Sequence, residues 1–166
     1  MSYRNKTYVI FDGDNDMWAY AYMKGWKNKE HIDFNFYDAH DILSLTNRAS
    51  EARVKQILRQ RMANAKQVLV LVGESTKNLY RFVRWEIDLA LQLNLPIIVV
   101  NLNNNRSVDA MRCPPILRDH CVIHVAFKMK IIKFALDGFS EWYVREGRLH
   151  PGPRHYANSV YQNLGI

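Results

Sequence analysis

Glu86 has the clearest chemical potential in this sequence, because it interrupts an apolar pattern. The segment 82–90 predicts a helix whose apolar residues recur at spacings of three or four: Leu79, Val83, Ile87, Ala90 and Leu91. Glu86 falls on that same stripe. A carboxylate on the core-facing side of a helix is costly unless it has partners or lines a cavity. The position therefore indicates either a structural ion pair, with a neighbour such as Arg81 or Arg84, or a functional acid.

A second acidic group follows the first predicted strand, in the run Phe11-Asp12-Gly13-Asp14-Asn15-Asp16. The run lacks the twelve-residue ligand spacing and terminal glutamate of a calcium loop. It favours a tight turn at Gly13, with Asp16 capping the next helix. The alternative is a substrate-facing role for its backbone and for Asp12 or Asp14.

Several common catalytic motifs are absent from the sequence. Only Gly13 and Gly73 follow predicted strands, so neither the dinucleotide fingerprint nor the phosphate-binding P-loop is present. No nucleophile elbow surrounds Ser75, which argues against a serine hydrolase. The third strand ends in Gly73-Glu74, without the aspartate that a receiver-type phosphoacceptor needs. The six histidines show no metal-binding spacing, and we predict no metal site.

Strands and helices alternate along the chain. The predicted strands cover residues 8–11, 32–36, 68–72, 97–100 and 121–125, and the predicted helices cover 17–26, 50–65, a segment ending before Pro96, and 128–136. Val68–Val72 is continuously apolar, as expected of a central parallel strand. We expect Ser50 to cap its helix, and a polar loop over 101–115 to hold a short helix near 108–111. The pattern predicts an α/β fold, with a flavodoxin-like, doubly wound, five-stranded parallel sheet of order 2-1-3-4-5.

This topology locates the candidate site, because ligands bind beyond the carboxyl ends of the strands in such sheets. Those ends carry residues 12–16, 38–41, 73–76 and 101–105. Ser75 should therefore lie near the first acidic cluster. A helix beginning at Thr76 would put Glu86 about 15 Å down its axis, too far from the crevice. We therefore predict a loop from Thr76 to Leu79, and a helix that begins near Tyr80 or Arg81.

Composition narrows the class of protein. The 166 residues favour one domain, with a core over about 7–136 and an aromatic extension over 138–166 that packs on the domain or on a partner. No apolar run approaches a membrane span, and two cysteines do not make a disulfide framework, so we expect a cytoplasmic protein without a membrane partner. The net charge of +7 comes from scattered residues without a nucleic-acid-binding motif. We do not expect a nucleic-acid partner; an anionic small ligand, such as a dinucleotide, would also gain from the charge.

Two segments carry a family resemblance. Leu71-Val72-Gly73-Glu74-Ser75-Thr76, followed by Phe82-Val83-Arg84-Trp85-Glu86-Ile87, resembles the TIR-like domains of bacterial anti-phage Thoeris systems, of the ThsB type. Other matching positions are Phe11, Asp16, Trp26, Phe36, Asp38 and the strand after Pro96, so that the resemblance covers residues 7–136. The chain departs from the family pattern at Phe82, where tryptophan is usual, and in the aspartate-rich first loop.

The resemblance implies an enzyme that cleaves the nicotinamide–ribose bond of NAD⁺, with NAD⁺ as substrate and no cofactor or metal. Glu86 matches the catalytic acid. Phe11, Asp12, Asp38 and Ser75 match positions that border the pocket, and Asp14 and Trp85 complete the predicted substrate-binding set. The resemblance further implies a cyclic or modified ADP-ribose signal for a separate effector, and self-association into a homo-oligomer.

Two other functions remain open at this point. A non-enzymatic TIR adaptor would work through its surfaces alone, with Glu86 sealed against an arginine and no cleft beside it. A nucleoside deoxyribosyltransferase-like enzyme shares the flavodoxin-like sheet and a helical glutamate, but would attack a nucleoside rather than a dinucleotide.

Overall fold

The computed structural model describes residues 6–29, 36–37, 50–79 and 81–166. Its centre is one parallel sheet with the strand order β2-β1-β3-β4-β5-β6. The strands are β1 (Thr7–Ile10), β2 (Phe36–Tyr37), β3 (Gln67–Val72), β4 (Ile97–Asn101), β5 (Ile123–Ala126) and β6 (Arg154–His155). The α-helices are α1 (Met17–Lys29), α3 (Glu51–Met62), α4 (Phe82–Gln92), α5 (Met129–Arg145) and α6 (Asn158–Asn163). The predicted α/β fold class is confirmed, and the observed order extends the predicted 2-1-3-4-5 by one strand at the β5 edge.

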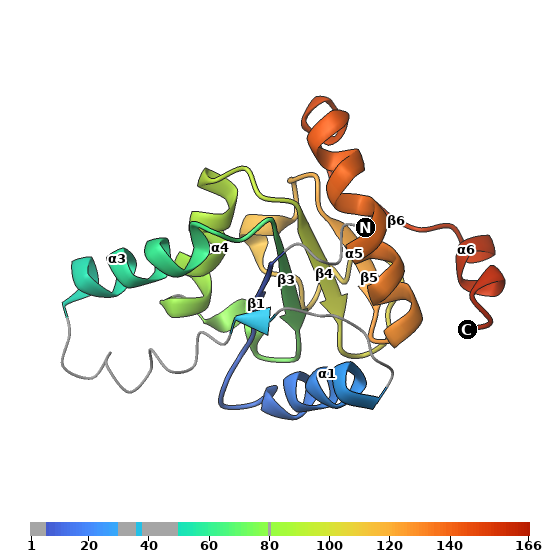
Figure 1. Cartoon of the computed structure of the whole chain (residues 1–166), viewed down its shortest axis with the longest axis horizontal. Coiled ribbons are helices and arrows are strands. Elements are labelled where there is room, and N and C mark those ends of the chain that lie inside the picture. The colour runs from blue at the N-terminus through green and yellow to red at the C-terminus, as the bar shows by residue number, and fades with distance from the viewer. Residues whose placement is uncertain (1–5, 30–35, 38–49, 80) are drawn as a thin grey trace.

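Helices cover both faces of the sheet (Figure 1). The helices α3 and α4 pack on one face, where Tyr8 and Ile10 of β1 point. The helices α1 and α5 pack on the other face, together with Val9 and Phe11. Alternate side chains of a strand point to opposite faces, so the direction of every β1 side chain follows from this arrangement.

The late start of the Glu86 helix is confirmed, whereas the predicted loop from Thr76 to Leu79 contains a short helix. A 3-10 helix over Thr76–Asn78 follows β3, and α4 begins only at Phe82. Glu86 is therefore four residues into α4, about 6 Å along its axis. The predicted cap of α3 is also confirmed, because the Ser50 hydroxyl accepts a hydrogen bond from the Arg53 backbone amide at 3.3 Å.

Some predicted boundaries were wrong. The last predicted helix continues through residue 138 to Arg145, so the expected break between core and extension falls inside α5. Residues 110–112 form a turn and no short helix forms near 108–111, because Asp109 Oδ1 accepts the backbone amides of Met111 (2.9 Å) and Arg112 (3.0 Å). The fifth strand begins at Ile123 rather than Cys121. In the predicted second strand, residues 32–35 lie outside the described residues, and the observed β2 begins at Phe36.

The C-terminal extension packs against its own domain. Arg154 and His155 form β6 beside β5, and α6 follows. Tyr161 is fully buried, its hydroxyl accepts the Ala126 backbone amide at 3.1 Å, and the Arg106 guanidinium lies 4.2 Å from its ring centroid. The extension thus adds to the core on the α1–α5 face.

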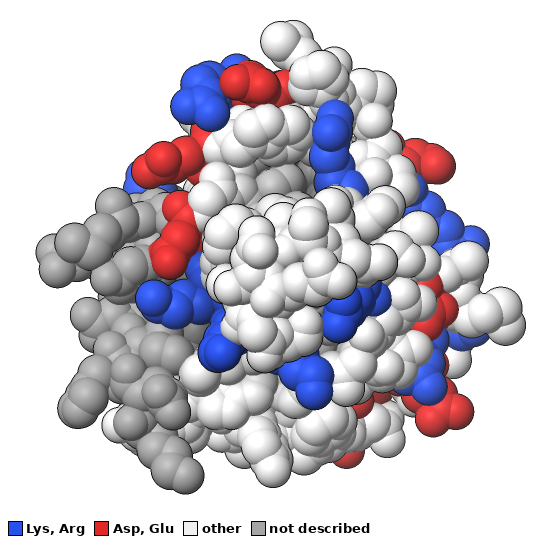
Figure 2. All heavy atoms as spheres, turned by 90° about the vertical axis from the view of Figure 1, so that its right-hand side faces the viewer, with Lys and Arg blue, Asp and Glu red and all other residues white. Residues whose placement is uncertain are grey.

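Two surface properties bear on partners. On the face that carries α5 and α6, lysines and arginines are spread among uncharged residues rather than gathered into one basic field (Figure 2). No helix of the described residues is long and apolar enough to cross a bilayer.

Candidate active site

Glu86 lies on the buried side of α4. Its exposed fraction is 5%, and its neighbours along the stripe, Val83, Ile87 and Ala90, are buried as well. The predicted placement of this carboxyl on the core-facing side is therefore confirmed.

The partner of Glu86 is a tyrosine of the first strand. The Tyr8 hydroxyl donates a hydrogen bond of 2.8 Å to Glu86 Oε1, and Tyr8 is fully buried. Within the described residues Glu86 makes no ion pair, so the alternative of a bridge to Arg81 or Arg84 does not occur there. Both arginines are exposed, and Arg81 instead lies over the rings of Phe82 and Trp85.

This environment changes the acidity of Glu86. Burial raises the pKa of its carboxyl from 4.5 to about 8, while the hydrogen bond from Tyr8 acts in the opposite direction. Without a bound cation, the protonated form therefore predominates near neutral pH. A carboxyl tuned to this range can exchange a proton during a reaction at physiological pH.

Asp12 is occupied inside its own loop. It is 2% exposed. Its Oδ1 accepts the backbone amides of Asp14 (3.0 Å) and Asn15 (3.3 Å), and its Oδ2 accepts the Asn15 side-chain amide (2.8 Å). These bonds close the predicted tight turn, whereas Asp14 is exposed to solvent. A substrate contact from this loop would come more readily from Asp14 or the backbone than from the Asp12 carboxylate.

Phe11 and Glu86 lie on different faces of the sheet. Phe11 stacks on Tyr20 of α1, with ring centroids 4.8 Å apart, and belongs to the cluster beneath α1 and α5. Tyr8, which binds Glu86, belongs to the cluster beneath α3 and α4. The structure therefore does not place the Phe11 ring beside the Glu86 carboxyl.

The loops after β1 and β3 are joined, as the topology predicted. The Gly73 backbone amide donates to Thr76 Oγ1 at 2.8 Å, and the Thr76 hydroxyl lies 3.4 Å from Asp16 Oδ2. Asp16 is buried, and burial, followed by the charge of Asp12, raises its pKa. Ser75 lies half-buried in this junction, but its side chain caps no helix. Sequence reasoning did not identify Thr76 as the contact residue, although its place at the end of the G-x-x-T pattern was a usable signal.

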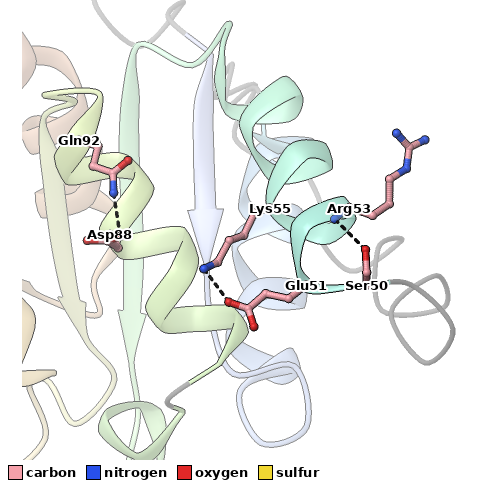
Figure 3. Close-up of polar contacts among 6 residues, drawn as sticks. All are labelled: Ser50, Glu51, Arg53, Lys55, Asp88 and Gln92. Atoms are coloured by element: carbon pink, nitrogen blue, oxygen red, sulfur yellow. Dashed lines mark hydrogen bonds and ion pairs between the residues drawn. The ribbon is translucent and has the colours of Figure 1, made fainter.

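Trp85 faces α3 rather than the sheet. It lines a pocket of about 200 Å³ between α3 and α4. Lys55 Nζ lies 4.7 Å from the Trp85 ring centroid. The other described lining residues are Leu58, Arg59, Asp88, Leu89 and Gln92. In Figure 3 the two helices lie side by side, with Lys55 bonded to Glu51 (2.7 Å) and Gln92 to Asp88 (2.9 Å). The described residues of this pocket do not include Glu86, so Trp85 and Glu86 lie on different sides of α4.

Asp38 lies outside the described residues, so its substrate contact stays a prediction.

Comparison with known proteins identifies the family. Residues 8–107, more than half of the chain, match the family model for the Thoeris protein ThsB, TIR-like domain. The match includes β1 with Tyr8, the junction of Gly73 and Thr76, and α4 with Glu86. A search of curated proteins found no match. The chain therefore belongs to the TIR-like domain family of the Thoeris anti-phage protein ThsB.

Proposed function

We propose that this protein is an NAD⁺-consuming signalling enzyme of anti-phage defence, acting in the cytoplasm, and that Glu86 is its catalytic carboxylate. The observation that carries the proposal is a buried carboxyl without a cationic partner among the described residues, in the first half of α4 because that helix begins only at Phe82. A buried acid without a cation is expensive for stability, which favours a functional reason for its presence.

The chemistry fits such a carboxyl. The bond between ribose C1′ and the nicotinamide nitrogen breaks, and its electron pair goes to the ring, which leaves as neutral nicotinamide. The ribose then carries oxocarbenium character, as in glycoside cleavage. A carboxylate held beside the sugar can accept hydrogen bonds from its hydroxyls and stabilise the positive charge. Water captures the ribosyl carbon and loses a proton to give ADP-ribose, whereas a nucleophilic atom of the same dinucleotide gives a cyclic product.

The acidity of Glu86 suits a cationic substrate. Before substrate binds, the carboxyl is largely protonated near neutral pH, since its pKa is about 8. A positively charged nicotinamide ring nearby would favour the carboxylate, because an opposite charge stabilises the ionised form. Substrate binding would thus release a proton and generate the catalytic form where it is needed.

The test is nicotinamide release from NAD⁺ by purified protein under phage-triggered conditions, compared with Glu86→Gln. Asp88→Asn is a matched control, because Asp88 is an exposed acid on the same helix whose hydrogen bond among the described residues comes from Gln92. We expect Glu86→Gln to abolish release and Asp88→Asn to retain it. Equal inactivity of the wild type and Glu86→Gln would contradict the proposal.

Product analysis defines the rest of the proposal. Mass spectrometry of NAD-derived molecules from cells that express wild type or Glu86→Gln should detect a cyclic or modified ADP-ribose only with the wild type. This molecule would be the signal for a separate effector. Deoxynucleosides in parallel incubations separate this activity from that of a deoxyribosyltransferase-like enzyme.

The adaptor alternative makes a different structural demand. It expects Glu86 sealed against an arginine, with no cleft beside it. No such arginine pair occurs among the described residues, and neither of the two described pockets, of Trp85 and of Pro114, is lined by Glu86. Self-association into a homo-oligomer is compatible with either function, and the solution mass tests it directly.

A further inference from the structure

Tyr8 is anchored more firmly than a residue of a loop could be. In β1 it pairs with Tyr37 of β2 on one side and with Val68 of β3 on the other. Its side chain is fully buried and reaches Glu86, 78 positions away in sequence. The position of the hydroxyl that donates to Glu86 is therefore set by the pairing of β1 with its two neighbouring strands.

The hydrogen bond from Tyr8 gives the two carboxyl oxygens of Glu86 different environments. Oε1 accepts the Tyr8 hydroxyl at 2.8 Å, and no hydrogen bond within the described residues engages Oε2. A single fixed donor at one oxygen limits rotation of the carboxyl group, and leaves the other oxygen able to accept a substrate hydroxyl.

We infer that Tyr8 is the positioning residue of the active site, which holds Oε1 of Glu86 so that Oε2 is presented to the ribose. This inference rests on the proposed function for its catalytic part. Its structural part, that the Tyr8 hydroxyl controls the orientation and ionisation of Glu86, does not depend on NAD⁺.

The donated bond also stabilises the carboxylate, because an O–H donor interacts more strongly with an ionised acceptor. The charged residues of α3 and α4 do not replace it. Lys55 is bonded to Glu51, Asp88 accepts from Gln92, and none of these charges shifts the pKa of Glu86. Loss of the Tyr8 hydroxyl should therefore make Glu86 harder to ionise.

The first experiment measures NAD⁺ cleavage against pH for wild type, Tyr8→Phe and Tyr161→Phe. Tyr161 is the matched control, since its buried hydroxyl accepts the Ala126 amide on the other face of the sheet. We expect Tyr8→Phe to move the acidic limb of kcat upward by about one pH unit, and to lower kcat more than it changes KM. Tyr161→Phe should leave the limb in place. An unshifted limb in Tyr8→Phe would overturn the inference.

A second probe should move the acidic limb of the pH profile in the opposite direction. A fluorinated tyrosine at position 8 has a more acidic phenol and donates a stronger hydrogen bond, so it should move the acidic limb to lower pH. This variant keeps the size and hydroxyl of the side chain, and therefore serves if Tyr8→Phe does not fold. Movement in the same direction as Tyr8→Phe would contradict the assignment.

The third measurement needs no activity. Unfolding free energy is followed against pH in four proteins: the wild type, Tyr8→Phe, Glu86→Gln and the double variant. The unfolding free energy of the wild type minus that of Glu86→Gln reports the titration of Glu86 with the Tyr8 hydroxyl present. The same difference between Tyr8→Phe and the double variant reports it without that hydroxyl. We expect Glu86 to titrate at higher pH when Tyr8→Phe is present. If the wild type does not cleave NAD⁺ but this shift occurs, the proposed function fails and the control of Glu86 by Tyr8 holds. If the wild type cleaves NAD⁺ but the shift does not occur, the proposed function holds and the control of Glu86 by Tyr8 fails.

Discussion

The Asp16 carboxylate lies against the α-carbon of Gly73, so closely that a β-carbon at Gly73 would collide with Asp16 Oδ2. Any larger residue would have to displace Asp16, so the glycine allows the loops after β1 and β3 to meet through Asp16 and Thr76. Close approach to Asp16 thus explains the glycine of the G-x-x-T pattern, since the φ angle of Gly73 is not positive.

Gly73→Ala should destabilise the protein by about 1–3 kcal/mol, because the buried carboxylate must move. Chemical denaturation measures the effect. Gly25→Ala is the control: Gly25 lies inside α1 with no atom within 4 Å of an added β-carbon, so alanine should instead stabilise by about 0.5–1 kcal/mol. Equal effects of the two substitutions would argue against the contact with Asp16.

Glu86 should make stability depend on pH. Its pKa is raised by burial from 4.5 in the unfolded chain to about 8 in the folded protein, so the folded state holds the extra proton between these values. The contribution is fully present below pH 4.5 and is lost as pH rises through 8. Relative to Glu86→Gln, the wild type should lose at most roughly 5 kcal/mol across this window. Urea denaturation of the two proteins at a series of pH values measures this loss. A difference in unfolding free energy that does not change with pH would show that the carboxyl is already ionised at acidic pH.

His124 should act in the opposite direction. It is fully buried on β5, and neither ring nitrogen has a hydrogen-bond partner among the described residues. Burial, followed by the neighbouring His155, lowers its pKa from 6.5 to about 4. The unfolded chain binds the proton more readily, so stability should fall by at most about 3 kcal/mol as pH drops from 6.5 to 4.

The substitution His124→Leu should remove this acid sensitivity, whereas His120→Leu, at an exposed position, should retain it. Thermal unfolding between pH 4 and 7 distinguishes the variants. Unchanged acid sensitivity in His124→Leu would assign the effect to another group.

Tyr161 should be required for the fold of the C-terminal extension. Tyr161→Phe removes the acceptor of the Ala126 amide and should cost about 1 kcal/mol, whereas Tyr161→Ala also leaves a cavity and should cost about 3–5 kcal/mol. Tyr22→Ala, at a position 62% exposed, should cost much less. Similar losses for Tyr161→Ala and Tyr22→Ala in guanidinium unfolding would show that the extension adds little to the core.

Local patterns predicted the parts of the fold that local physics determines. The apolar run Val68–Val72 forms the central strand, Ser50 caps α3, and α4 begins after the 3-10 helix as the position of Glu86 required. The end of α5 was missed because Gly138 resembles a helix stop. One glycine costs a helix only about 1 kcal/mol, and burial of Phe139 outweighs that cost. The two-residue β6 carries too short a pattern to be recognised.

The candidate site shows the same division. The alternation of β1 indicates that Phe11 and Tyr8 point to opposite faces of the sheet, as the structure shows. The bond between Tyr8 and Glu86 could not be predicted, because it joins positions 78 apart and depends on how α4 packs on the sheet. Nearby arginines looked plausible in sequence, but they lie on the solvent side of the helix.

The placement of the four tryptophans on the two sides of the sheet allows a fluorescence measurement at the Glu86 helix. All four tryptophans lie in the described residues; Trp18, Trp26 and Trp142 belong to the α1–α5 side, where Trp18 and Trp26 both contact Phe127. Trp85 alone sits between α3 and α4, beside the Lys55 ammonium and one residue from Glu86. Replacing the other three with phenylalanine would leave Trp85 of α4 as the single tryptophan, next in sequence to the proposed catalytic Glu86, and its emission could follow nucleotide binding in real time.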